Sequence, residues 1–424
     1  MQRIMQFAKE DGGATGTECE LPTTATATLA PEAESSLRPE EEMQVAPQEQ
    51  APGTFLSIGI LAGSSNPEFD VTALTSFFNQ TLFSELSKRG LCCEIICVMG
   101  EERTQATATV EKVFQAQVNS HEHRDTFICH MIRNPERNRS AAWNAFVHAS
   151  SEASSKFLFV MDGDVVIHNP DTLWNMFCTM GEKRDSVIVV DEPVKDIAFK
   201  PKRSLFDRLS LAVSHLALAG GKVIPEQLYV MRAEVARNIY LPNDLPMEGR
   251  FLAAVLGTDY LLKEPNSHRI VRAVGAAHTY KAHRSLGEIL QDRKRRMVNR
   301  TVTYVLVEGY LRHLSQQRKQ NMGVLLMQND ETEPPWLSDL METHIRRCYF
   351  FWQIFPNVTS IRIKRLQPLP EMEELRYVPI AYLEQFITLI GSWLAYHSMK
   401  RSLKQNHAVP LCIPNQQSRA TAMH

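Results

Sequence analysis

Short apolar runs alternate with segments of helical periodicity in the first half of the chain. Such runs begin at residues 54, 92, 156 and 186 and read TFLSIGILAG, CCEIICVMG, KFLFVMDGD and SVIVVDEP, which predicts strands buried on both faces. Between them, residues 71–90, 140–153 and 170–183 space their apolar positions as helices do. Strands that alternate with helices predict an α/β fold, with a mainly parallel sheet flanked by helices.

The two ends of the chain have other patterns. Residues 11–53 are rich in Ala, Thr, Pro and Glu and almost lack large apolar side chains, so we expect 1–53 to be a disordered tail. Residues 301–424 predict a helical C-terminal region, which leaves 54–300 as the α/β domain.

One apolar run in the C-terminal region bears on membranes. YVPIAYLEQFITLIGSWLAYHSMKRS begins at residue 377 and is about long enough to span a bilayer. Glu384 and Gln385 lie within it, and a charge near the middle of a membrane is costly. We therefore expect an amphipathic helix, flanked by Lys400 and Arg401, that packs on the preceding domain or lies in a membrane interface. A buried core helix is the alternative.

Composition and charge narrow the class of protein. Lys and Arg number 46 against 48 Asp and Glu among 424 residues, so the net charge of -2 gives no bulk attraction to nucleic acid. The 8 cysteines show no paired metal-binding spacing, and the N-terminus has no continuous apolar segment of a secretory signal. We expect a cytoplasmic protein, with the cytoplasmic face of a membrane as an alternative place.

Two aspartates follow the strand at residue 156. Asp162 and Asp164 flank Gly163 at the carboxyl end of that strand, where ligands of open parallel sheets lie. Carboxylate oxygens presented there suit Mg²⁺ or Mn²⁺ together with substrate phosphates. Asp and Gly are also favoured turn residues, so a plain turn is the competing interpretation of the tripeptide.

With this D-x-D turn, the chain resembles the family 2 glycosyltransferases of the GT-A fold, roughly over residues 55–300. In that family the D-x-D binds the metal and the diphosphate of a nucleotide sugar, and a patterned helix precedes it. RNPERNRSAAWNAFVHASSE stands in the place of that helix, with Asn134, Arg139, Ala142 and Asn144 at the family's positions. The resemblance implies that Arg139 contacts the diphosphate and that Asn144 and Asp162 belong to the donor site.

The resemblance also implies a general base. In the family an acidic motif precedes an apolar helix, and its acid takes the proton of the acceptor hydroxyl. This chain has LPNDLPMEGRFLAAVL, where Glu248 is the best match and Asp244 the second. A plain helix N-terminal acid is the competing interpretation of Glu248.

Further residues follow from the same resemblance. A histidine beyond the base motif completes the metal shell in some relatives, and His278 or His283 is placed to do so. Nucleotide recognition falls to Glu68 after the first strand and to Glu101 or Glu102 after the second. QDRKRR at residues 291–296 has cations for a leaving diphosphate or an anionic lipid, with a solvated helix face as the alternative.

The predicted activity is metal-dependent transfer of a sugar from a nucleotide-diphosphate donor to a hydroxyl acceptor, with inversion, using Mn²⁺ or Mg²⁺. The expected partners are the donor and a polysaccharide, glycan or lipid-linked acceptor, without nucleic acid and with peripheral membrane contact. A nucleotidyltransferase of related fold is one alternative. A degenerate domain that only binds a nucleotide or a partner is the other.

Overall fold

The computed structural model describes residues 54–62, 67–100, 105–134, 138–219, 224–283, 285–355, 358–360, 363, 366 and 371–404. The predicted tail at 1–53 lies outside the described residues. The domain boundaries expected from the sequence therefore stay predictions.

A single eight-stranded sheet forms the centre of the molecule, in the order β3-β2-β1-β4-β7-β6-β8-β5. β1 pairs in parallel with β2 and β4, β2 with β3, and β6 with β8. β7 runs antiparallel between β4 and β6, and β5 is antiparallel to β8. The strands are β1 (Thr54–Ala62), β2 (Cys92–Gly100), β3 (Phe127–Asn134), β4 (Phe157–Asp162), β5 (Val166–Ile167), β6 (Ile188–Lys195), β7 (Leu228–Arg232) and β8 (Ile270–Tyr280).

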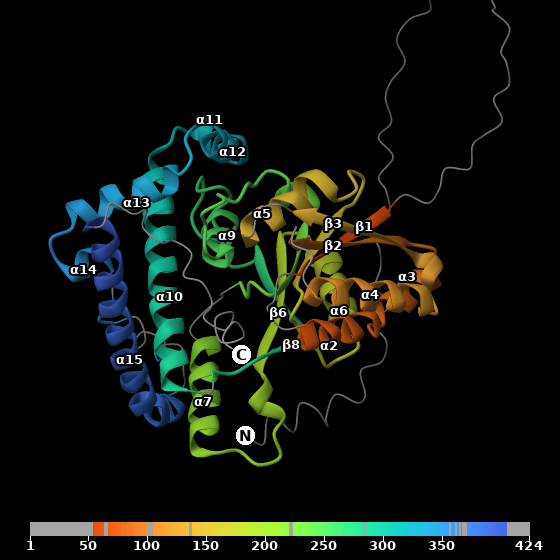
Figure 1. Ribbon diagram of the computed structural model, residues 1–424, viewed down its shortest axis with the longest axis horizontal. Helices are drawn as coiled ribbons and strands as arrows, with labels where there is room; N and C mark the ends of the chain where they lie inside the picture. Colours follow the sequence, from red (N-terminus) through yellow and green to blue (C-terminus); the bar gives the residue numbers. More distant parts are fainter. Residues whose placement is uncertain are drawn as a thin grey trace, which may run out of the picture.

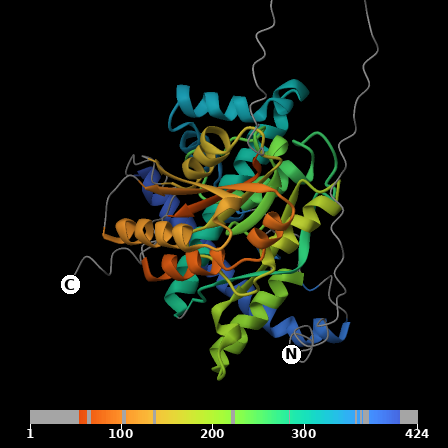
Figure 2. The same cartoon turned by 90° about the vertical axis from the view of Figure 1, so that its right-hand side faces the viewer.

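Helices pack on both faces of the sheet, as Figures 1 and 2 show from two sides. They are α2 (Pro67–Phe78), α3 (Leu82–Lys88), α4 (Gln105–Ser120), α5 (Arg139–Asn144), α6 (Thr172–Glu182), α7 (Leu205–Ala219), α8 (Ala233–Ala236), α9 (Glu248–Gly257), α10 (Leu286–Tyr304), α11 (Gln316–Gln320), α12 (Met322–Thr332), α13 (Trp336–Arg347), α14 (Phe351–Ile354) and α15 (Glu371–Lys404). π-helical turns extend α5 over Ala145–Ser150 and α10 over Val305–Tyr310, and short 3-10 turns lie at Arg124–Thr126, Asp196–Phe199 and Leu311–His313.

Side-chain alternation along β4 divides the core in two. Leu158 and Val160 join a cluster with residues of α5, α9 and α10, whereas Phe159 and Met161 join one with residues of α2, α3, α4 and α6. All four side chains are at most 1% exposed. Burying one such side chain contributes about 1.5–3 kcal/mol, so β4 is held rigidly from both faces. This rigidity positions the residues that follow its last residue.

The C-terminal helix α15 lies beside α10 (Figure 1). The two helices approach closely at Gly391, where an added Cβ would lie 2.7 Å from the Cβ of Arg293. Glu384 and Gln385, the polar residues inside the apolar run, are only 2% and 5% exposed. Glu384 pairs with Arg293, and the amide of Gln385 donates to the carbonyl of Val358 at 2.5 Å. The helix therefore turns its polar residues toward the protein.

The predicted fold class is confirmed: an α/β protein with a mainly parallel sheet flanked by helices and a helical C-terminal region. The predicted strands at 54, 92, 156 and 186 correspond to β1, β2, β4 and β6. The single helix expected at 71–90 is two helices, since residues 79–81 interrupt it. Strands β3, β5 and β8 were not expected.

Candidate active site

The turn after β4 lies at the carboxyl end of four adjacent parallel strands, β3, β2, β1 and β4. β4 ends at Asp162, whose N–H donates to the carbonyl of Gln227 at 2.8 Å. The N–H of Gly163 donates to Leu61 on β1 at 2.9 Å. A Cβ on Gly163 would lie 2.9 Å from the Cα of Ala62, so only glycine fits between the two aspartates. The close packing against β1 therefore fixes the D-x-D turn.

Arg139 connects this turn to two other segments. Asn138 caps α5 by accepting a hydrogen bond from the N–H of Ala141 at 2.6 Å, which places Arg139 in the first turn of the helix. Its guanidinium pairs with Asp162 and donates to the backbone carbonyl of Glu226. It also donates to both carboxylate oxygens of Glu248, at 2.8 and 3.0 Å.

Opposing effects act on the charge of this arginine. Desolvation alone would lower the pKa of Arg139, but the carboxylate of Glu248, together with Tyr229 and Glu226, holds that pKa above its usual value. The cation is therefore fixed where three backbone segments converge.

Glu248 is the first residue of α9 and is 1% exposed. Besides Arg139, it accepts a hydrogen bond from the hydroxyl of Tyr229 at 3.3 Å, and that hydroxyl accepts one from the indole of Trp143 at 2.9 Å. Desolvation raises the pKa of Tyr229, and the neighbouring Glu248 raises it further. The predicted base, Glu248, is therefore buried and hydrogen-bonded to both Arg139 and Tyr229.

A second glutamate lies beside the first. Glu226 is half-buried, and one of its carboxylate oxygens accepts a hydrogen bond from the N–H of Gly249 at 3.1 Å. Desolvation, followed by repulsion from Glu248, raises the pKa of Glu226 to about 8. A carboxyl group with a pKa near neutrality is suited to proton transfer.

A buried histidine lies on the other side of the D-x-D turn. His278 is 0% exposed; its Nδ1 lies 2.6 Å from Asp191 and its Nε2 lies 3.1 Å from the side-chain oxygen of Gln227. Asp164 is exposed, but desolvation still raises its pKa against the attraction of Arg139 and His278. His278 and Asp164 are thus near enough for their charges to interact.

The donor chemistry here fits a divalent metal. Asp162, Asp164 and His278 offer carboxylate oxygens and an imidazole nitrogen, which Mn²⁺ accepts. Asp191 holds His278 as outer carboxylates hold ligating histidines, and its second oxygen has no hydrogen-bond partner among the described residues. No group of three such donors is arranged to hold a metal in the described part of the chain, where Arg139 pairs with Asp162 and Gln227 engages His278.

The other residues predicted for the site lie in varied places. Asn144 is buried and exchanges two hydrogen bonds with the backbone of Leu241, at 2.7 and 3.0 Å, so its side chain holds α5 to the segment before α9. Glu68 belongs to α2, but its side chain is not described, and Glu101 lies outside the described residues. Asp244 is half-buried, and desolvation raises its pKa.

Sequence reasoning missed four residues of this site. Glu226 and Gln227 come directly before β7, Tyr229 lies within β7, and Asp191 lies in β6. The signal available for Glu226 was an acid shortly before a short apolar run, in VIPEQLYV. Its proximity to Glu248 depends on β7 lying antiparallel beside β4, which no local pattern indicated.

Comparison of the sequence with known proteins assigns no family, since no family model and no curated protein matches the chain.

Among solved structures, the chain is similar to the glucosyl-3-phosphoglycerate synthase of Mycobacterium tuberculosis, with 13% identity over 59% of this chain and 81% of that chain and a TM-score of 0.38. The same protein in complex with Mn²⁺, uridine-diphosphate-glucose and phosphoglyceric acid gives 13% identity over 59% and 80%, with a TM-score of 0.40. A mycobacterial protein gives 14% identity over 59% and 75%, with a TM-score of 0.40. At these TM-scores the likeness carries no weight for the chemistry of this chain.

Proposed function

We propose that the chain transfers a glycosyl group from a nucleotide-diphosphate donor to a hydroxyl acceptor, as a divergent family 2 member of the GT-A glycosyltransferases. One observation carries the proposal: the D-x-D turn, Arg139 and the pair of Glu226 and Glu248 converge at the carboxyl end of β4. Binding sites of open α/β sheets lie at this edge. A turn with a purely structural role does not require four acidic side chains around one arginine.

On the donor side, Asp162, Asp164 and His278 would hold Mn²⁺ or Mg²⁺, which when bound supplies Lewis-acid stabilisation of a departing diphosphate. Arg139 would contact the diphosphate, since its planar guanidinium binds phosphate oxygens well. Glu68 and Glu101 stay predictions for nucleotide recognition.

On the acceptor side, the proton of the hydroxyl would pass to the carboxylate pair. Resemblance assigns this role to Glu248. Glu248, however, is buried and makes two hydrogen bonds to Arg139. We therefore propose that the more exposed Glu226 meets the hydroxyl, and that Glu248 helps to raise the pKa of Glu226. Direct displacement with one base would invert the anomeric carbon. A polysaccharide, glycan or lipid-linked acceptor and a cytoplasmic location stay as proposed from the sequence.

Calorimetric titration with UDP, GDP and dTDP, each with and without Mn²⁺, tests the donor site. We expect one nucleotide to bind with metal and to bind at least about tenfold more weakly to Asp164→Ala, since a charged contact of this kind is worth roughly 1.5–3 kcal/mol. Asp185→Asn is the control, because Asp185 is exposed and remote from the D-x-D turn. Equal affinity in EDTA would remove the metal from the proposal.

The two alternatives give different products. A glycosyltransferase releases nucleoside diphosphate from a nucleotide sugar, whereas a nucleotidyltransferase releases pyrophosphate from a nucleoside triphosphate. Binding of a nucleotide without either product, across a panel of donors, would favour a binding domain.

Peripheral membrane contact is a second proposal, favoured by the surface of α15. Tyr377–Leu403 is the one candidate membrane span among the described residues. Its most apolar stretch of 18 residues has a mean hydropathy of 1.3 and is 39% buried. It presents Tyr382, Phe386 and Trp393, all more than half exposed. Because Glu384 is anchored to α10, we propose that this helix lies on a membrane rather than crossing it.

Co-sedimentation with vesicles tests the contact. Vesicles of phosphatidylcholine with phosphatidylserine should pull down the full chain, and the double change Phe386→Glu with Trp393→Glu should release it. Val324→Glu is the control, since Val324 is an exposed apolar residue on α12. Wild type that stays in the supernatant would leave α15 as a helix of the domain core.

A further inference from the structure

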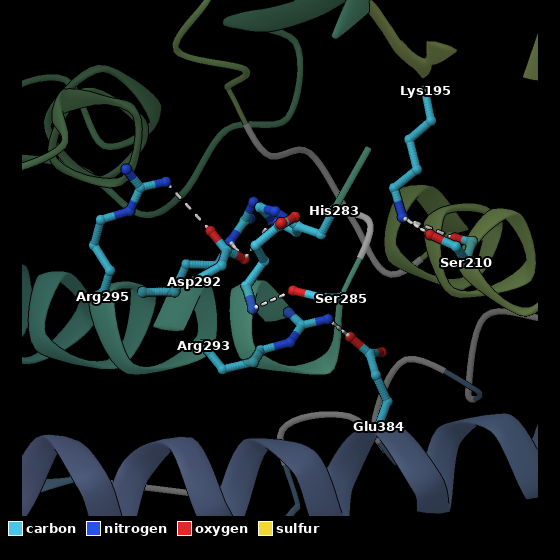
Figure 3. A network of polar contacts seen from close by, with 10 residues as sticks. Lys195, Ser210, His283, Ser285, Asp292, Arg293, Arg295 and Glu384 are labelled. Atoms are coloured by element: carbon cyan, nitrogen blue, oxygen red, sulfur yellow. Dashed lines mark hydrogen bonds and ion pairs between the residues drawn. The ribbon is translucent and has the colours of Figure 1, made fainter. Parts of the chain in front are cut away.

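A cluster of cations lies beside the carboxylate pair, where β6, β8, α7, α9 and α10 meet. Its described members carry five positive side chains against the carboxylates of Asp292 and Glu384: Lys195, Arg250, Arg293, Arg295 and Arg296. Figure 3 shows the part around Asp292, with Arg295 and His283 directed to it and Arg293 reaching Glu384 on α15.

Part of this positive charge is not neutralised by the carboxylates of the cluster. Asp292 is shared by His283 at 3.5 Å, Arg295 at 3.3 Å and Arg296 at 2.7 Å. Five cations against the two carboxylates leave a surplus of three, or of two when Glu226, which attracts Arg250 and Arg296, is counted as well. Desolvation, with repulsion from Arg293 and Arg296, lowers the pKa of Lys195 to about 8.

Two of the arginines, Arg250 and Arg296, are exposed and lie on helices next to Glu226. Arg250 follows Gly249, whose N–H donates to Glu226 at 3.1 Å, and α10, which carries Arg296, contacts α9. Arg250, in the first turn of α9, is exposed and has no hydrogen bond or ion pair with any described residue. Desolvation lowers its pKa, Arg296 lowers it further, and Glu226 opposes both. The side chain of Arg296 is 48% exposed, and it too acts on Glu226. Arg250, Arg296 and Glu226 therefore lie in one neighbourhood.

Buried nitrogens in the same cluster also lack partners. The Nε atoms of Arg293 and Arg295 are buried and make no hydrogen bond among the described residues. These two nitrogens are not reachable from solvent, so the cations available to an oxyanion such as phosphate or carboxylate are the exposed guanidinium groups of Arg250 and Arg296.

We propose that Arg250 and Arg296 bind an anionic group, a phosphate or a carboxylate, on the hydroxylated acceptor. The inference rests on the proposed glycosyl transfer, because it places the acceptor's hydroxyl at Glu226 and its charged group a few atoms away. The acceptor is thus a small acid or phosphate ester, or the charged end of a lipid-linked one. A neutral glycan offers nothing to neutralise these cations.

Calorimetric titration of the full chain with inorganic phosphate, and separately with acetate, at constant ionic strength is the first test. We expect Arg250→Gln and Arg296→Gln each to weaken binding of at least one of the two anions about tenfold or more. Arg312→Gln is the matched control, since Arg312 pairs with Glu308 four residues earlier as Arg296 does with Asp292, and its side chain is 52% exposed. Because Arg250 makes no hydrogen bond or ion pair with any described residue, we expect Arg250→Gln to fold as wild type does. Wild-type affinity in both variants would overturn the proposal.

A repeat at saturating nucleoside diphosphate and Mn²⁺ separates the two ends of the active site. We expect phosphate to bind with nearly unchanged affinity, since its site is on the acceptor side. Competition with the nucleotide would place the anion at the donor diphosphate and overturn the inference. Phosphate binding that depends on Arg250, in a chain that binds no nucleotide, would leave the anion site standing and remove the proposed transfer.

Discussion

Two charged centres lie within one molecule, and they are opposite in balance. At the end of β4, Asp162, Asp164, Glu226 and Glu248 gather around one arginine, and the pKa values of Asp164 and Glu226 are raised. Around α10, cations from several elements surround the carboxylates of Asp292 and Glu384. The pKa of Asp292 falls well below its usual range, and that of Lys195 falls to about 8. Each centre lacks the counter-charge that the other has in excess.

The difference shows what each centre lacks. The acid-rich centre is completed by a cation, such as the metal proposed there, and the cation-rich centre by an anion. Their closeness through Glu226, Arg250 and Arg296 favours a substrate that presents an anionic group near a reacting hydroxyl. The comparison can be tested by removing charge from each centre separately.

The largest expected effect is on turnover. Glu226→Gln keeps the shape of the side chain but removes the basic oxygen, so we expect transfer or donor hydrolysis to slow by about 10²- to 10⁴-fold while donor affinity stays nearly intact. Glu248→Gln should lose stability as well as turnover, because Arg139 would lose its buried partner. Asp244→Asn should change turnover little. An active Glu226→Gln with a stable, inactive Glu248→Gln would return the base to Glu248.

The next effect is a loss of folding stability in the cation-rich centre. Arg293→Met leaves Glu384, which is 2% exposed, without its partner, and breaking such a pair costs about 3–5 kcal/mol. The double change Arg293→Met with Glu384→Leu should recover most of this loss. Urea unfolding measures both variants. A single variant as stable as wild type would show that the contact between α10 and α15 contributes little.

The pH dependence of stability should differ in sign between the centres. The folded pKa of Glu226 lies near 8, above its unfolded value near 4.5, so its contribution is present below about pH 4.5 and is lost as pH rises through 8. The melting temperature of wild type should therefore fall relative to Glu226→Gln between pH 5 and 8. A constant difference across that range would show that the pKa of Glu226 is not raised.

The smallest expected effect is the change with pH in the stability that Asp292 contributes between pH 5 and pH 8. Its folded pKa is lowered, mainly by Arg296 and His283 working against desolvation, so its contribution is present above the unfolded pKa near 3.8 and is lost at lower pH. Asp292→Asn should be destabilised by the same amount at pH 5 and pH 8. The gap in melting temperature between this variant and wild type should close only in acid.

The sequence predicted the fold better than the site. Strands β1, β2 and β4 are apolar runs buried on both faces, a pattern that is legible locally. β3 reads FICHMIRN and is partly exposed at the sheet edge, so its polar residues concealed it. The D-x-D turn was found because its position depends on one strand. The proximity of Glu226 to Glu248, and the bonds of Asn144 to Leu241, depend on long-range packing that no window of sequence contains.

Arg139 couples the two sides of the proposed active site thermodynamically. One guanidinium holds Asp162 on the proposed donor side and Glu248 on the proposed acceptor side. A ligand that draws it from Asp162 therefore changes the field at Glu248 and Glu226. By linkage, a proton bound at Glu226 must alter the affinity for that ligand by the same factor that the ligand alters proton affinity. Donor binding measured against pH will therefore report the protonation of the acceptor side before any acceptor is known.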